Sequence, residues 1–63
     1  MAATRWVMVD LSDSQIIHTG VCMYEHLEQV PLADNHAVIV SPIGDAGQYW
    51  NGIGPQDDPI PPP

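Results

Sequence analysis

The side chains that could support chemistry are one cysteine, Cys22, and three histidines, His18, His26 and His36. Cys22 and His26 are four residues apart, a spacing that places both on one face of a helix and could supply two zinc ligands. Zinc sites built this way usually contain a second close pair, and His18 and His36 are not spaced to form one. We therefore expect no metal site and no cofactor.

A cysteine nucleophile is the second chemical possibility. Cys22 could be activated by His18 or His36, but such a pair also needs a cleft and a nearby cation that favours the thiolate. The chain has no lysine, and its one arginine, Arg5, is far from Cys22 in sequence. We therefore expect Cys22 to pack as a small apolar residue, and we expect no enzymatic activity.

The carboxylates are numerous but dispersed. Eight acidic residues against one arginine give a net charge of −7. No two of these carboxylates have the sequence context expected of the acid–base pair in a glycosidase. Such a distribution is typical of a surface that favours solubility. The adjacent pair Asp57 and Asp58 could instead dock onto a basic partner, and both interpretations stay open.

The remaining candidates for contact are aromatic and proline residues. Tyr49 and Trp50 are adjacent, so on a strand one would face the core and the other would face outward. Trp50 is a candidate partner contact, and its partial burial within the same sheet is the alternative. Pro59 and Ile60 begin a loose P-x-x-P pattern that lacks the basic residue usual in ligands of proline-reading domains. This tail could be a pre-extended arm on a neighbouring protein, with Ile60 as its apolar anchor, or a disordered end.

Charge and composition exclude several classes of function. A charge of −7 with one arginine cannot form the basic footprint that nucleic-acid binding needs. There is no run of 18 or more apolar residues, so we expect no membrane span. The first residues lack the pattern of a secretory signal, and a lone cysteine cannot form an intramolecular disulfide.

The elements that must position these residues are mostly short strands. Short runs of apolar, β-branched and aromatic residues predict strands at residues 5–11, 15–19, 37–40 and 48–50. Apolar spacing predicts one helical turn or a loop over residues 23–30. The expected fold is mainly β, a small antiparallel β-meander of three to four short strands. It would form a module over residues 1–53, followed by an extended Pro-rich C-terminal arm over residues 54–63, which holds five of the seven prolines.

A chain of 63 residues has little core of its own. About 60% of the surface exposed on unfolding is buried at this size, so the free energy of folding is marginal. We therefore expect neighbouring molecules to supply part of the stability.

Two motifs and their order resemble a known group of proteins. A Val-Met-Val-Asp strand is followed by Ile-Ile-His-Thr-Gly at residues 16–20, with Cys22 close behind. A Leu-Glu-Gln-Val-Pro linker, an Ala-Val-Ile-Val strand, Tyr-Trp-Asn-Gly at residues 49–52 and terminal prolines complete the pattern. The chain resembles short virion proteins of tailed bacteriophages, often associated with tails or tail fibres. The resemblance implies a place in the virion, no catalysis, no cofactor and many copies in a symmetric assembly.

These observations predict a non-enzymatic structural protein of a tailed-phage virion that binds other virion proteins, in the tail or fibre-attachment region. The expected partner-binding residues are Trp50, Asp57, Asp58, Pro59 and Ile60, and neither nucleic acid nor membrane is expected as a partner. A capsid decoration or cement protein is the first alternative. A small acidic inhibitor or mimic that blocks a basic site on a host protein is an alternative of another class, and an isolated metal-binding module is a third.

Overall fold

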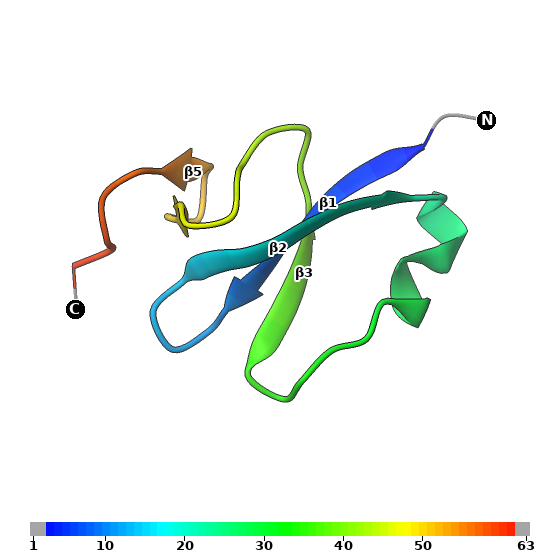
Figure 1. The fold of residues 1–63 in the computed structure, drawn as a ribbon, viewed down its shortest axis with the longest axis horizontal. Helices are drawn as coiled ribbons and strands as arrows, with labels where there is room; N and C mark the ends of the chain where they lie inside the picture. The colour runs from blue at the N-terminus through cyan, green and yellow to red at the C-terminus, as the bar shows by residue number, and fades with distance from the viewer. Residues whose placement is uncertain (1–2, 62–63) are drawn as a thin grey trace.

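The computed structural model describes residues 3–61 as a five-stranded antiparallel sheet with one short 3-10 helix. In chain order the elements are β1 (Thr4–Asp10), β2 (Gln15–Cys22), the 3-10 helix η1 (Tyr24–Gln29), β3 (His36–Val40), β4 (Tyr49–Trp50) and β5 (Pro55–Gln56). The strands lie in the order β3-β1-β2-β4-β5 (Figure 1). The mainly β, antiparallel class predicted from the sequence is confirmed.

The strand order differs from the predicted meander at β3. This strand pairs with β1 rather than with β2, because η1 and the linker after it carry the chain back to the other side of β1. Val7, Met8 and Val9 of β1 are all buried, so both faces of this strand are covered. Strand β1 is an interior strand of the sheet, with β2 paired on one side and β3 on the other. The structure has five strands rather than three or four because β4 and β5 are separate two-residue strands.

The turn between β1 and β2 is built by side chains that bind their own backbone. The Asp10 carboxylate accepts hydrogen bonds from the backbone N–H of Ser12 at 2.9 Å and from the Ser12 hydroxyl at 2.6 Å. The Asp13 carboxylate accepts one from the N–H of Gln15 at 3.0 Å. Ser14 closes the turn with a left-handed φ of 62°. Ser and Asp at residues 12–14 favour such a turn, because their side chains bind nearby backbone groups.

A β-bulge interrupts the pairing of β1 with β2. Met8 pairs with His18 and Val9 pairs with Ile16, which leaves Ile17 as an extra residue on β2. Strand β2 also continues through Gly20 to Cys22, although the sequence predicts its end at Thr19.

The continuation of β2 depends on a contact between a glycine and a tryptophan. Gly20 pairs with Trp6, and a Cβ atom at position 20 would lie 2.4 Å from the Trp6 indole. The indole therefore occupies the space where a side chain of residue 20 would be. Glycine usually weakens a strand, but here the indole of the cross-strand neighbour Trp6 covers Gly20.

The core lies on one face of the sheet. Val7, Val9 and Ile16 form its buried cluster, and Ile39 and Trp50 pack against it from partly buried positions. The alternation along β1 explains this arrangement, since Val7 and Val9 share a face and Met8 faces the other way.

The loop before β4 covers the core and is fastened to β1. Gly44, with φ of 121°, lies so close to Val7 and Ile16 that a Cβ atom there would be 3.3 Å and 3.2 Å from their side chains. The Arg5 guanidinium donates a hydrogen bond of 2.5 Å to the Gly44 carbonyl and lies 3.9 Å from the Asp45 carboxylate. The one arginine of the chain therefore holds this loop over the core.

The helical turn predicted over residues 23–30 is present as η1. It is a 3-10 helix with no buried residue, and Met23, Leu27 and Val30 are half-buried. Within residues 3–61, no helix has the length and apolar character needed to cross a membrane.

The beginning of the predicted arm is attached to the sheet. Pro55 and Gln56 form β5, which pairs with β4 at the edge of the sheet, the position that a proline tolerates. The Gln48 amide donates a hydrogen bond of 2.8 Å to the Asp57 carboxylate. Residues 58–61 then run away from the sheet (Figure 1). The boundary between residues 53 and 54 falls inside the β4–β5 hairpin, and it stays a prediction.

Candidate protein-interaction site

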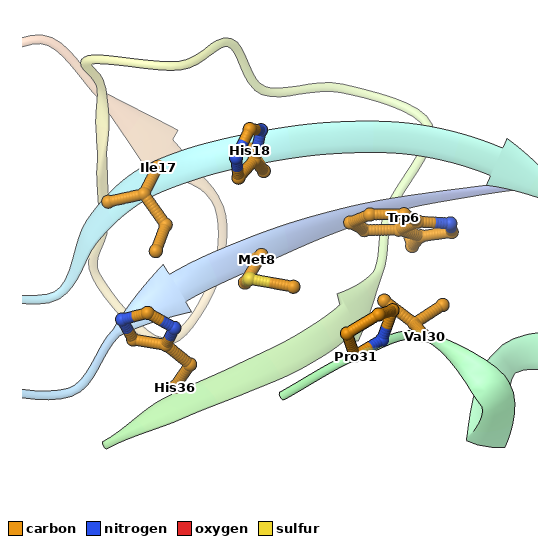
Figure 2. Close-up of a pocket in the computed structure, with 7 residues that line it drawn as sticks. All are labelled: Trp6, Met8, Ile17, His18, Val30, Pro31 and His36. Carbon is orange, nitrogen blue, oxygen red and sulfur yellow. The ribbon is translucent and has the colours of Figure 1, made fainter. Parts of the chain in front are cut away.

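An apolar groove lies on the face of the sheet opposite the core. Its concave volume is about 580 Å³, within the range of roughly 300–1,000 Å³ typical of ligand-binding clefts. The strands contribute Trp6, Met8, Ile17, His18 and His36, and the linker after η1 contributes Val30 and Pro31. Figure 2 shows Trp6, Val30 and Pro31 toward one end, Ile17 and His36 toward the other, and Met8 and His18 between them.

The strand pairing explains why these side chains meet. Trp6 and Met8 alternate with the core residues of β1, so both face the groove. His18 pairs directly with Met8 and therefore shares its face. Ile17 joins them because the bulge places an extra residue at this point of β2, and bulges re-aim side chains in this way.

The titratable side chains that line the groove are two imidazoles. His18 is exposed, and His36 is half-buried on β3 opposite Asp10. The hydrogen bonds from Ser12, and to a smaller extent the nearby His36, hold the pKa of Asp10 below its ordinary value of 3.8. In residues 3–61, no group of three or more His, Cys, Asp and Glu side chains is placed to hold a metal ion. The arrangement suits an apolar ligand that carries a hydrogen-bond acceptor or a negative charge.

The free edge of β3 is a second feature suited to a partner. Ala37 and Ile39 are the residues of β3 whose backbone groups face β1 in the hydrogen-bonded ladder, and they alternate with Val38 and Val40. Antiparallel pairing therefore turns the backbone N–H and C=O groups of Val38 and Val40 toward the free edge. Strand β3 contains no proline, lysine or carboxylate, the residues that commonly protect an edge from pairing with another chain.

The tip of the β4–β5 hairpin presents one apolar side chain to solvent. Ile53 is 93% exposed. Its turn is ordered, since the Asn51 side-chain oxygen accepts hydrogen bonds from the N–H groups of Ile53 and Gly54 at 2.8 Å and 2.9 Å. A fully exposed isoleucine on an ordered turn is available as a contact residue.

The structure separates the predicted site residues into two groups. Trp50 is half-buried and packs against the core cluster, so only part of its side chain is available to a partner. Asp57, Asp58 and Pro59 are exposed and follow one another at the β5 edge, with Ile60 half-buried beside them. Their role in binding stays a prediction.

Sequence reasoning missed the groove. In the sequence, Trp6 and Met8 alternate with Val7 and Val9, and this alternation indicates that both faces of β1 are apolar. The contributions of Ile17 and Pro31 were not visible, because the first depends on a bulge and the second on where the linker after η1 lies. Comparisons of the chain with protein-family models, with curated proteins and with solved structures found no match.

Proposed function

We propose that this protein is a non-enzymatic structural component of a tailed-phage virion that binds other virion proteins, in the tail or fibre-attachment region. The proposal combines the resemblance of the sequence with the surfaces of the fold. One observation carries the binding role. The apolar groove over β1, β2 and β3 is left open on a module whose own core is the cluster of Val7, Val9 and Ile16.

The exposed apolar residues support a role in contacts. Besides Ile53, the large apolar side chains of residues 3–61 with at least half of their surface exposed are Leu11, Val21, Tyr24, Leu32, Val40 and Ile43. Single exposed apolar residues are ordinary. Here they accompany an open groove and an unprotected strand edge, and together these features favour a surface that is covered by other proteins.

The small core supports a place in an assembly. A module of this size gains little stability from burial within one chain. Contacts with neighbours would add to it, since binding to the folded state stabilises that state. A virion with many copies at high local concentration provides such contacts.

The experiment is quantitative mass spectrometry of virions purified from the phage whose genome encodes this sequence. We expect the protein in intact particles at a fixed number of copies. A copy number near that of tail or fibre proteins, and recovery with isolated tails, would support the proposed position. Recovery with tail-less heads at capsomer stoichiometry would instead identify a capsid decoration protein.

The same measurement tests the alternative of another class. An acidic inhibitor of a host protein would be made in infected cells and would be missing from purified particles. Its absence from particles would overturn the proposed function.

A further inference from the structure

We propose that the groove of one molecule binds the C-terminal arm, residues 57–61, of a second copy of this chain. The inference rests on the proposed binding role and names the partner of one of its surfaces. It is carried by the chemistry of the groove, the chemistry of the arm, and the positions of the two on the fold.

The apolar part of the groove suits a proline-rich segment. Trp6, Pro31 and Met8 provide aromatic and aliphatic surface. Proline-rich segments dock into aromatic-lined grooves because their backbone is already extended and loses little entropy on binding. Pro59 and Pro61 enclose Ile60 in the arm, and residues that precede a proline favour the extended conformation. Ile60 is half-buried in the single molecule, and it is then the side chain that enters the groove of the second copy.

The polar part of the groove suits the acidic start of the arm. Asp57 and Asp58 come directly before Pro59 and are both exposed. His18 and His36 are the titratable residues that line the groove, and His36 also lies opposite Asp10 of β1. An imidazole N–H donates a hydrogen bond to a carboxylate, and a protonated imidazole adds an attractive charge.

The one arginine of the chain is not available to bind the acidic pair. The Arg5 guanidinium is engaged with the Gly44 carbonyl and with Asp45, over the core and away from the groove. The two groove histidines are therefore the complementary groups for Asp57 and Asp58.

The position of the arm points to a second molecule as the partner. The groove lies over β3, β1 and β2, whereas the arm leaves the sheet beyond β5, at the opposite edge. In Figure 1 residues 58–61 run away from the sheet, and η1 and its linker lie at the other end of the molecule. The hydrogen bond between Gln48 and Asp57 fixes where the arm begins. Five residues at about 3.1 Å each extend some 15 Å from that point, directed away from the groove of the same chain.

An arm that binds the groove of the next copy produces a head-to-tail contact. Each molecule then offers one arm and one groove, and such contacts close into a ring or continue as a filament. This geometry agrees with a protein present in many copies.

The first experiment measures self-association of the full chain by sedimentation equilibrium over a range of concentrations. We expect the unaltered protein to self-associate and Ile60→Asp to weaken its association constant at least tenfold, since the variant places a charge in an apolar groove. His18→Asp should do the same from the other side, because it sets a carboxylate against Asp57 and Asp58. Ala46→Asp is the matched control, since it places the same charge on an exposed apolar residue outside the arm and the groove, and it should associate like the unaltered protein.

The second experiment mixes the two defective variants. Ile60→Asp keeps an intact groove and His18→Asp keeps an intact arm, so the mixture should form one-to-one dimers that grow no further. A synthetic peptide of residues 55–63 should also shift the indole N–H resonance of Trp6 in the Ile60→Asp protein. Circular dichroism spectra of each variant check that the fold is retained.

Two outcomes would overturn the inference. The first is self-association that neither variant weakens, as pairing through the free β3 edge would give. The second is a mixture that stays monomeric together with a peptide that leaves the Trp6 resonance unchanged, which would assign the groove to a different protein. Neither outcome changes whether the protein is found in virions, so failure here is distinguishable from failure of the proposed function.

Discussion

The contact between Trp6 and Gly20 affects both the pairing of β2 with β1 and the shape of the groove. The indole lies where a side chain at position 20 would be, and the same indole forms one end of the groove. The glycine therefore matters for the shape of the binding surface as well as for the continuity of β2.

Replacement of Gly20 with alanine should displace the Trp6 indole. The added Cβ atom would lie 2.4 Å from the ring, so we expect a loss of about 1–3 kcal/mol in the free energy of unfolding, as for other overpacked sites. Urea denaturation followed by tryptophan fluorescence measures this. Gly54→Ala is the control, because nothing lies within 4 Å of a Cβ atom there. Equal stability of the two variants would show that the indole does not occupy this space.

Asp10 makes a pH-dependent contribution to the stability of the fold, because its pKa is lowered in the folded state. Ser12 lowers the pKa of Asp10 below 3.8, so the stabilisation is present above pH 3.8 and is lost as the pH falls through the pKa of the folded state. Ser12→Ala removes the hydroxyl donor and should raise the pKa of Asp10 toward its ordinary value. A carboxyl NMR titration measures the change. An unchanged pKa in the variant would show that the hydroxyl is not the main cause.

At the scale of elements, the loop over the core depends on Arg5. Its hydrogen bond to the Gly44 carbonyl is charge-assisted and partly buried, so Arg5→Ala should lower the free energy of unfolding by about 1.5–3 kcal/mol. Asp45 is 86% exposed at 3.9 Å from the guanidinium, and pairs of this kind contribute at most about 1 kcal/mol. Asp45→Ala should therefore have the smaller effect in the same urea titration. A larger loss from Asp45→Ala would show that the ion pair, rather than the carbonyl contact, holds the loop.

The sequence predicted the elements better than their pairing. Local features were sufficient for β1, for the turn at residues 12–14 and for the short helical segment, because alternation and turn-forming side chains act over a few residues. The position of β3 beside β1 and the bulge at Ile17 arise from contacts between segments distant in sequence. The groove depends on both features, so its residues could not be assembled from local patterns.

At the scale of the whole molecule, the pairing of β5 with β4 continues the sheet past residue 54. Removal of residues 58–63 leaves the β4–β5 pairing and the bond between Gln48 and Asp57 in place, so the melting temperature should change by only a few degrees. Removal of residues 55–63 also deletes β5 and the Pro55 side chain that lies beside Gly44. This longer truncation should melt at a clearly lower temperature when followed by circular dichroism. Equal melting of the two truncations would place the domain boundary at residue 54, as the sequence predicts.

Arg5, which holds the loop over the core, is also the single site at which trypsin can cleave this chain. Arg5 is the only lysine or arginine in the chain, and it is half-buried within β1. Cleavage there requires the chain to open, so when reclosing is fast the digestion rate follows the unfolding equilibrium. A complete digest leaves residues 6–63 as one long peptide that routine peptide identification is poorly suited to detect. Mass spectrometry that relies on trypsin is therefore poorly suited to detect this protein, and digestion at its glutamates and aspartates would give shorter peptides.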